Sequence, residues 1–243
     1  MPPGTDVSSS TEVAVVTGAS SGLGRSIAIR LAKENFHLVL ASRNEEKLRS
    51  LQVEISNDGG NSTVIPTDVS SETSVDNLVV KAEEIGSVSV VINNSGLGLF
   101  SNISEHSIED FDRQINVNLR GSFLVSRGFI PGMKNKQTGK LVFINSVAGK
   151  WGYPFSAGYV ASKFGLTGLA NSLRNELRED NIKVISIFPG AIDSPFWDAV
   201  NVNFPREEMM TSEDVAETVV HSIMMPGISV LEEIVMRRVQ GDF

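Results

Sequence analysis

Three residues in the second half of the chain carry side chains that together can transfer a proton. Tyr159 and Lys163 are four residues apart in a stretch whose apolar spacing predicts a helix, and Ser146 precedes the tyrosine by thirteen residues. Residues four apart on a helix share one face. A lysine ammonium placed there lowers the pKa of a tyrosine from its reference of about 10, so Tyr159 could serve as acid or base near neutral pH. Taken alone, the pair could equally be a packed aromatic beside a surface lysine.

A glycine-rich segment near the start of the chain has the pattern of a phosphate-binding turn. It follows the apolar run 13–16 and precedes a stretch with helical periodicity. Glycine permits the sharp turn and the close approach of the backbone to a pyrophosphate, and the helix N-terminus supplies amide donors and a positive dipole end. The predicted cofactor contacts of this turn are Gly18, Ser20, Ser21, Gly22, Leu23 and Gly24.

The end of the next apolar run indicates which dinucleotide is bound. An acid about 20 residues after the glycines holds a ribose 2′-hydroxyl, whereas a 2′-phosphate requires a cation. Here Ala41 and Ser42 precede Arg43 and no acid stands among them. We therefore predict NADP(H), preferred over NAD(H), with Ser42 and Arg43 as contacts; an exposed surface arginine is the alternative. Asp68 could hydrogen-bond the adenine amine, cap the next helix, or do both, and Val69 beside it is also predicted to contact the cofactor.

The elements that must position these residues alternate between strand and helix. Strands are predicted over 13–16, 37–41, 62–66, 88–92, 140–144, 183–188 and 233–239, and helices after Gly24 and over 45–55, 71–85, 107–133 (as two helices), from Tyr159 to Glu179, and over 212–225 with Ser212 as the N-cap. Repeated βαβ units give a parallel sheet covered on both faces. The predicted fold is α/β, a single-domain doubly wound parallel seven-stranded sheet with helices on both faces, whose ligands lie at the carboxyl ends of the strands.

Composition narrows the classes of function and partner. The 243 residues include no cysteine, which excludes disulfides and suits a reducing cytoplasm, and the three histidines have no metal-ligand spacing. A net charge of −8 argues against nucleic acid as a partner, and no apolar run is long enough for a membrane span. Residues 1–11 show no signal-peptide pattern and predict a flexible tail, with the domain over 12–243.

In chain order, these residues resemble the short-chain dehydrogenase/reductase family. The matching stretches are T-G-A-S-S-G-L-G from Thr17, Asp68, N-N-S-G from Asn93, Asn118 within N-V-N-L, Ser146, Y-V-A-S-K from Tyr159 and P-G-A-I-D-S from Pro189. The resemblance covers nearly the whole chain. It implies a Rossmann fold and an NADP(H)-dependent reductase of the carbonyl and hydroxy-acid branch.

The resemblance also assigns roles to matched positions. Tyr159 would be the general acid in reduction, Ser146 would polarise the substrate carbonyl, and Lys163 would bind the nicotinamide ribose and depress the tyrosine pKa. Asn118 would hold a water that relays protons between Lys163 and solvent. Further cofactor contacts implied by the family are Asn94, Ser95, Gly96, Tyr159, Lys163, Pro189, Gly190, Ile192 and Ser194.

Two departures from the family pattern bear on these expectations. Ser95 replaces the usual alanine, which keeps a small residue there, and the C-terminal glycine pair that helps pack a tetramer in many members is missing. The predicted substrate contacts are Ser146, Val147, Trp151, Tyr153, Tyr159, Phe196 and Trp197, with a lid over about 191–211. This aromatic lining favours an apolar ketone or acyl chain over a sugar or polyanion.

Three hypotheses follow. The first is an NADPH-dependent carbonyl reductase or alcohol dehydrogenase for a medium-sized apolar substrate. The second is a 3-oxoacyl-(acyl-carrier-protein) reductase, against which the missing glycine pair counts. The third is a regulator that senses NADPH without turnover, although a sensor need not keep all four catalytic-type residues. The apolar content of the helices over 107–133 and 159–179 further predicts a homodimer or homotetramer.

Overall fold

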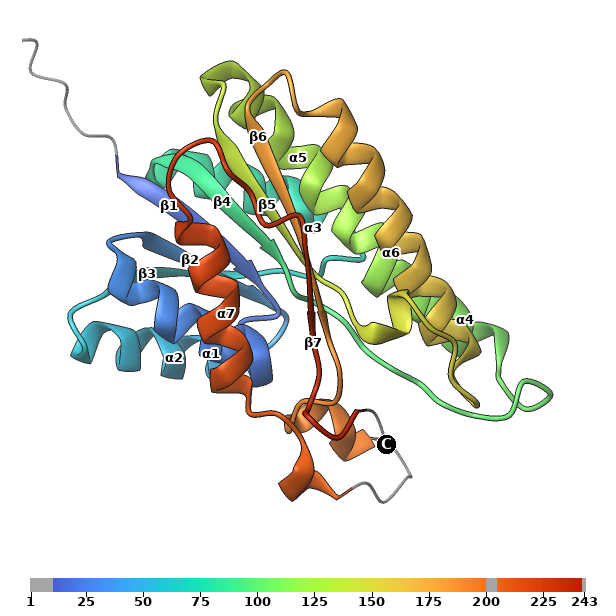
Figure 1. Cartoon of the computed structure of the whole chain (residues 1–243). Helices are drawn as coiled ribbons and strands as arrows, with labels where there is room; N and C mark the ends of the chain where they lie inside the picture. Colours follow the sequence, from blue (N-terminus) through green and yellow to red (C-terminus); the bar gives the residue numbers. More distant parts are fainter. Residues whose placement is uncertain (1–10, 200–204, 242–243) are drawn as a thin grey trace, which may run out of the picture.

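Seven parallel strands form one continuous sheet in the computed structural model, which describes residues 11–199 and 205–241 (Figure 1). The strands are β1 (Glu12–Thr17), β2 (His37–Ser42), β3 (Asn61–Pro66), β4 (Ser87–Asn93), β5 (Gly139–Ile144), β6 (Ile182–Pro189) and β7 (Glu233–Met236). Their order across the sheet is β3-β2-β1-β4-β5-β6-β7. The predicted doubly wound α/β fold is thereby confirmed, and residues 1–10 of the predicted tail lie outside the described part of the chain.

Helices cover both faces of this sheet (Figure 1). One face carries α1 (Gly22–Leu31), α2 (Glu45–Asn57) and α7 (Ser212–Met224), and the other carries α3 (Glu72–Ile85), α5 (Gly121–Lys136) and α6 (Ala157–Glu176), with α4 (Ile108–Gln114) packed against α6. Short helical turns complete the chain at η1 (Ala32–Glu34), η2 (Ile115–Arg120, a π-helix), η3 (Val147–Gly149), η4 (Pro195–Ala199) and η5 (Arg206–Glu208).

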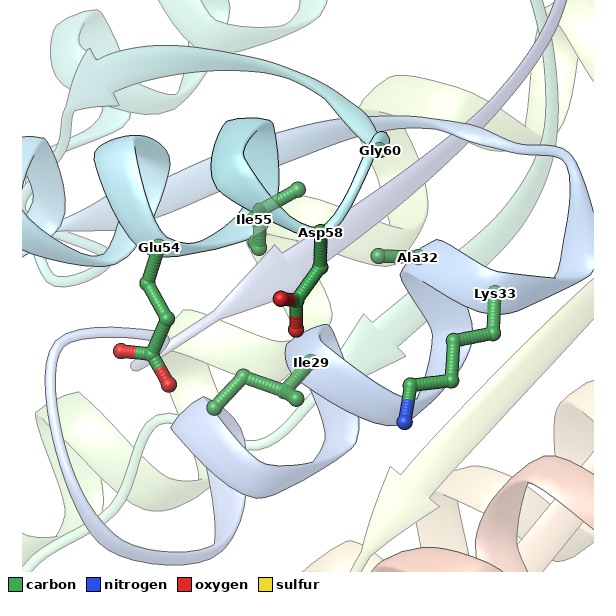
Figure 2. A pocket seen from close by; sticks show the side chains of 7 residues that line it. All are labelled: Ile29, Ala32, Lys33, Glu54, Ile55, Asp58 and Gly60. Atoms are coloured by element: carbon green, nitrogen blue, oxygen red, sulfur yellow. The ribbon is translucent and has the colours of Figure 1, made fainter.

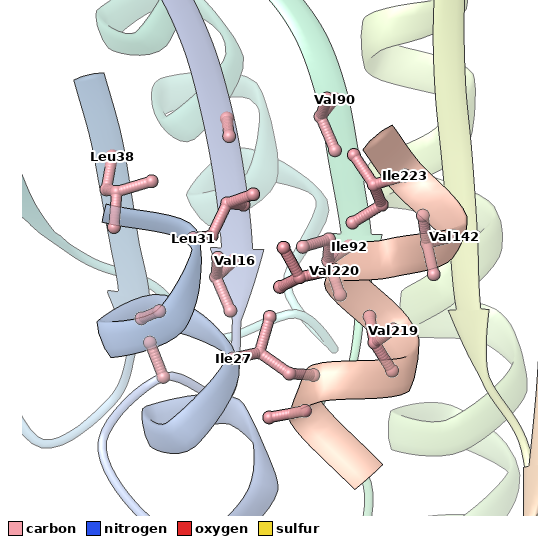
Figure 3. Close-up of a cluster of buried hydrophobic side chains, with 14 of the residues drawn as sticks. Val16, Ile27, Leu31, Leu38, Val90, Ile92, Val142, Val219, Val220 and Ile223 are labelled. Atoms are coloured by element: carbon pink, nitrogen blue, oxygen red, sulfur yellow. The ribbon is translucent and has the colours of Figure 1, made fainter. Parts of the chain in front are cut away.

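The strands are buried on both faces because alternate side chains enter two separate cores. In β1, Ala14 and Val16 pack with Ile27 and Val219 under α1 and α7, whereas Val13 and Val15 enter the core under α3, α5 and α6. Figure 3 shows the first of these cores, with α7 lying across the strands beside α1. This burial on both faces explains why the strands appear in the sequence as continuous apolar runs.

The order of the strands places a crevice beside β1. Strands β1 and β4 are neighbours, yet the chain leaves β1 toward β2 and leaves β4 toward β5, so their connecting loops diverge. In open parallel sheets, ligands bind at such a point, outside the carboxyl ends of the strands. The glycine turn after β1 and the loop after β4 lie at this point.

The structure corrects three predictions about where helices and strands begin or end. The N-cap of α7 is Thr211, whose side chain accepts from the Asp214 amide, and Ser212 is the first helical residue. Ser71 caps α3, which excludes the cap role considered for Asp68. The last strand ends at Met236, short of the predicted residue 239. Among the helices over 11–199 and 205–241, none is long and apolar enough to cross a membrane.

Candidate active site and cofactor cleft

The turn after β1 contains three glycines at positions where a side chain is unfavourable. Gly18 and Gly22 have φ angles of 66° and 51°, a region that favours glycine. A Cβ on Gly24 would lie 2.4 Å from the carbonyl oxygen of Gly18. Ser21 is the N-cap of α1 but its side chain makes no capping bond, and the first turn contains no acid. The N-terminal amides of α1 therefore fit a phosphate.

Side chains at the end of β2 also fit a phosphate group. The hydroxyl of Ser42 is buried and has no hydrogen-bond partner among the described residues, an arrangement that costs free energy unless a ligand or water completes it. Arg43 follows it and is exposed. Asp68 accepts from the Ser70 amide at 2.9 Å and the Ser70 hydroxyl at 2.7 Å. These bonds, and the charge of Arg43, hold the pKa of Asp68 below its usual value.

The loop after β4 is bonded directly to the turn after β1. The hydroxyl of Thr17 accepts from the amides of Asn94 at 3.0 Å and Ser95 at 3.1 Å, and the Asn94 carboxamide donates to the Thr17 carbonyl at 2.9 Å. A Cβ added at Gly96 would lie 3.8 Å from the ammonium of Lys163. The structure thus brings the predicted contacts 94–96 between the glycine turn and the predicted catalytic residues.

Ser146, Tyr159 and Lys163 lie together. Ser146 follows β5, where its hydroxyl accepts from the Ala148 amide at 3.1 Å and is hydrogen-bonded to the Tyr159 phenol. Lys163 is 5 % exposed. Its ammonium donates to the Ile144 carbonyl at 3.0 Å and lies 5.7 Å from the centre of the Tyr159 ring. The spacing in sequence therefore becomes a contact between β5 and α6.

Burial dominates the electrostatics of this group. It raises the pKa of Tyr159 to about 12, partly offset by the hydrogen bond from Ser146, and it lowers the pKa of Lys163 to about 8. Loss of hydration disfavours the charged form of each side chain. The prediction that Lys163 lowers the pKa of Tyr159 is therefore wrong for these residues by themselves, because burial has the larger effect and raises that pKa. They hold the phenol protonated near neutral pH.

Asn118 lies in the π-helical turn η2 and is fully buried. Its carboxamide accepts from the Leu97 amide at 2.9 Å and donates to the Leu97 carbonyl and the Ser162 hydroxyl, both at 2.9 Å. Ser162 in turn donates to the Tyr159 carbonyl at 2.7 Å. The extra residue of a π-turn is a frequent feature of functional sites. Here Asn118 ties the loop after β4 to the helix that carries Tyr159.

Aromatic side chains form one wall of the site. The rings of Phe100 and Phe196 lie 5.6 Å and 5.7 Å from the ring of Tyr159, and Trp197 stacks on Phe100 at 6.2 Å. A Cβ on Gly98 would lie 2.4 Å from Phe196. The loop after β4 and the predicted lid therefore meet directly over the tyrosine.

Three other predicted pocket residues lie in the segment after β5. Trp151 is 44 % exposed and faces the guanidinium of Arg237 at 5.1 Å. Tyr153 lines a hollow of about 270 Å³ with Phe155, Val160 and residues 101–103. Val147 is buried in the first turn of η3. The residues around Trp151 in the sequence could not predict its contact with Arg237, because Arg237 lies near the C-terminal end of the chain.

The lid makes contacts among its own residues and with the glycine turn. Ile192 pairs with Met210 as an isolated bridge, and Ser194 packs on the glycine turn, where a Cβ on Gly22 would lie 3.2 Å from its own. Arg206 donates to Asp193 at 2.6 Å and Asp198 at 2.7 Å. Residues 200–204 of the predicted lid lie outside the described residues. Pro189 ends β6, and the Gly190 amide donates to the Met236 carbonyl at 2.8 Å.

Another depression, shown in Figure 2, lies between residues that precede β2 and β3. It holds about 10 Å³ and is lined by Ile29, Ala32, Lys33, Glu54, Ile55, Asp58 and Gly60. These residues precede β2 and β3, so the depression is at the amino end of the sheet, and its size is about that of one water molecule. Within the described ranges, no three His, Asp or Glu residues are grouped to hold a metal ion.

Sequence comparison identifies relatives that span the chain. The model of the short chain dehydrogenase family matches residues 12–203. A sepiapterin reductase of Chlorobaculum tepidum is 33% identical over 238 residues, covering 95% of this chain and 97% of the relative. An uncharacterized oxidoreductase of Staphylococcus aureus is 34% identical over 229 residues, covering 94% and 97%.

This chain belongs to the short-chain dehydrogenase family. It is an oxidoreductase, and its fold agrees with solved members. An alcohol dehydrogenase from Thermococcus sibiricus, complexed with 5-hydroxy-NADP, superposes with a TM-score of 0.87 at 29% identity and covers 94% of this chain and 97% of its own. A single-residue variant of actinorhodin polyketide ketoreductase, solved with NADPH, has a TM-score of 0.87 at 29% identity, covering 96% and 98%.

Two residues near the site of this short-chain dehydrogenase were not predicted from the sequence. Gln114 is fully buried and accepts from the Leu99 amide at 2.9 Å, and His106 contacts Gln114 at 3.2 Å. A signal for Gln114 exists in the sequence, because a polar residue four positions before Asn118 shares its helix face. His106 carries no such signal, since its partners come from segments that only the fold brings together.

The buried lysine generates a prediction for the stability of the protein without cofactor. The pKa of Lys163 is about 8 in the folded protein, against an ordinary value of 10.5. The unfolded chain therefore binds more protons between these values, and the free energy of unfolding rises with pH across that window, by at most about 1.4 kcal/mol per unit. Lys163→Met should reduce this rise.

The measurement is urea unfolding between pH 7.5 and 9, where Tyr159 stays largely protonated in the folded protein and in the unfolded chain, in which its pKa is about 10. The exposed Lys47 on α2 gives the matched control, since Lys47→Met should leave the rise unchanged. Equal slopes in the native protein and Lys163→Met would show that burial does not disfavour the ammonium of Lys163.

Proposed function

We propose that this chain is an NADP(H)-dependent carbonyl reductase or alcohol dehydrogenase, which reversibly reduces the ketone of a medium-sized apolar substrate to the secondary alcohol. The observation that carries the proposal is the placement of Tyr159. Its phenol is hydrogen-bonded to Ser146, and its ring is flanked by Phe100 and Phe196. A proton donor in an apolar aromatic setting suits a neutral carbonyl.

The catalytic residues have distinct roles in this proposal. In reduction, the Tyr159 phenol donates its proton to the carbonyl oxygen, and Ser146 donates a second hydrogen bond to the same oxygen. Bound NADPH supplies the hydride. The ammonium of Lys163, 5.7 Å from the tyrosine ring, stabilises the phenolate that proton transfer leaves behind. The predicted water beside Asn118, through which Lys163 would exchange protons with solvent, remains part of the proposal.

The preference for NADP(H) is supported by the end of β2. The buried hydroxyl of Ser42 has no partner within the described part of the chain, and Arg43 is exposed next to it, so the pair offers a donor and a cation to a 2′-phosphate. The residues of the glycine turn fit the pyrophosphate. Similar solved structures carry 5-hydroxy-NADP, NADP and NADPH.

A neutral substrate is supported by the way the lid uses its arginine. Arg206 is engaged by Asp193 and Asp198 and by the Ser194 carbonyl at 2.8 Å. Because these acceptors occupy the guanidinium, it is not directed to a substrate carboxylate. An uncharged ketone needs no cation of this kind.

A 3-oxoacyl-(acyl-carrier-protein) reductase is the second candidate. The likeness to the actinorhodin polyketide ketoreductase, at a TM-score of 0.87, favours it. A sensor of NADPH that does not turn over is the remote third. The joint placement of Ser146, Tyr159 and Lys163 counts against it, because binding alone does not require a buried proton donor.

The proposal extends to assembly and location. Helices α4, α5 and α6 each expose a large apolar side chain, at Phe111, Phe123 and Phe164, which are 40 %, 43 % and 47 % exposed. We propose that this side forms the contact of a homodimer or homotetramer. The cysteine-free chain suits a reducing compartment, and we propose a cytoplasmic location.

Replacement of the proton donor tests the mechanism. Tyr159→Phe keeps the ring and removes the hydroxyl, so kcat should fall by about 10³-fold or more, while the Kd for NADPH changes less than about threefold. Initial rates of NADPH oxidation with aryl ketones, keto esters, sepiapterin and a 3-oxoacyl thioester would measure this. Preference for the thioester would select the second candidate. Tight NADPH binding without turnover of any carbonyl would select the sensor.

Replacement of the exposed arginine tests the cofactor preference. Arg43→Ala removes the cation opposed to a 2′-phosphate and should raise the KM for NADPH about tenfold, because a charge-assisted bond contributes about 1.5–3 kcal/mol. The KM for NADH should change less than about twofold. Arg49→Ala, an exposed arginine of α2 that is paired with Glu45, is the control. A native protein that prefers NADH would contradict the proposal outright.

A charge on the exposed face of α6 tests assembly. Phe164→Glu should lower the mass measured by light scattering to that of a monomer of 26.2 kDa, since burial of an unpaired carboxylate in a contact is costly. Val53→Glu, at a 59 % exposed position on α2, should leave the mass unchanged. A native mass equal to the monomer would refute the oligomer.

A further inference from the structure

The loop 97–101 is anchored on one side and faces the site on the other. The amides of Leu97, Leu99 and Ser101 donate to Asn118, Gln114 and the Phe155 carbonyl, each at 2.9 Å. The residues between them turn the opposite way, where Gly98 meets Phe196 and Phe100 meets Tyr159. Contacts that alternate in this manner make the position of Phe100 dependent on the anchors of its neighbours.

Gln114 is the central anchor. It is fully buried and ends α4, one helical turn before Asn118. A Cβ on Gly158 would lie 2.5 Å from its Nε2, so the glycine that precedes Tyr159 leaves the space in which the carboxamide lies. Gln114 therefore touches both the loop that carries Phe100 and the helix that carries the tyrosine.

His106 determines the orientation of this carboxamide together with Leu99. The Leu99 amide can only donate, so the oxygen of Gln114 must face it and the NH₂ group must face His106 Nε2 at 3.2 Å. That nitrogen must then accept, which leaves the ring proton on Nδ1, 2.7 Å from the Ser101 hydroxyl. One histidine tautomer thus satisfies the whole set of bonds.

We propose that Gln114, oriented by His106, is a positioning residue that sets Phe100 against Tyr159 and so determines which ketones are accepted. The inference rests on the proposed reductase activity for its kinetic readout. Phe100 contacts Tyr159, Phe196 and Trp197, so a displacement of the loop changes the volume beside the proton donor. The phosphate end of the cleft is built from other segments and keeps its affinity.

The test compares Gln114→Met with the native protein. Methionine keeps the length of the side chain but cannot accept from Leu99, so a buried amide is left unpaired. The ratio of kcat/KM for a bulky aryl ketone to that for a small methyl ketone should change about tenfold, with kcat/KM for the aryl ketone falling, whereas the Kd for NADPH changes less than about twofold. Hydrogen exchange at the Leu99 amide should accelerate about tenfold or more.

Two further variants separate positioning from general damage. Gln114→Glu keeps oxygen acceptors for Leu99 and for a protonated His106, and should restore most of the selectivity and of the Leu99 protection. Gln52→Met is the matched control, because Gln52 on α2 also bonds the backbone through its side chain, donating to the Ser62 carbonyl at 2.8 Å. It should leave the ratio and the Leu99 exchange unchanged.

The outcomes are distinct. A shifted ratio with faster Leu99 exchange in Gln114→Met, and recovery in Gln114→Glu, supports the proposal. An unchanged Leu99 exchange rate overturns it, as does faster exchange with an unchanged ratio. If Gln114→Met does not fold, His106→Leu must produce the same effects in smaller degree, and their absence overturns the proposal. A native protein inactive on every ketone refutes the proposed function, while the exchange rates still decide whether Gln114 positions the loop.

Discussion

The architecture of the cleft depends on the hydrogen bonds made by one buried hydroxyl, that of Thr17. It donates to the Ile92 carbonyl at 3.1 Å and accepts from the amides of Asn94 and Ser95. These bonds join the ends of β1 and β4, the strands whose loops diverge. Because Gly18 and Gly24 carry no Cβ, the two segments can approach closely enough for the bonds to form. The glycine turn after β1 and the loop after β4 are therefore held against each other.

A second constraint is the free-energy cost of burying polar side chains beside the junction of β1 and β4. Asn118, Gln114 and Lys163 are almost wholly enclosed, and each is retained because specific backbone groups complete its hydrogen bonds. The Leu97 and Leu99 loop takes its shape from these side chains, since it has no strand partner of its own among the described residues. Burial also raises the pKa of Tyr159 to about 12. The protonated phenol and the position of the aromatic wall therefore both depend on the burial of this part of the site.

The lid adds the apolar side of the site. Phe196 and Trp197 reach Tyr159 and Phe100 across the carboxyl edge of the sheet, while Arg206 pairs with Asp193 and Asp198 of the lid itself. The result is a protonated phenol flanked by rings, with the ammonium of Lys163 beside it. This arrangement, rather than the fold, is what favours a neutral carbonyl.

Local sequence was enough to predict the alternation of strand and helix, the turn at Gly18, Gly22 and Gly24, and the grouping of Ser146, Tyr159 and Lys163. The alternation and the turn follow from periodicity and from backbone freedom, which the chain carries residue by residue, whereas the grouping was predicted from the spacing of the three residues and from the family resemblance. Helix caps were misplaced by a residue or more, at Ser212 and Asp68, because several neighbouring hydroxyl and carboxylate groups can cap equally well. The raised pKa of Tyr159, the pairing of Trp151 with Arg237, and the place of Gln114 between Leu99 and Gly158 emerged only in the folded chain. Those depend on burial and on partners distant in the chain, which no local pattern records.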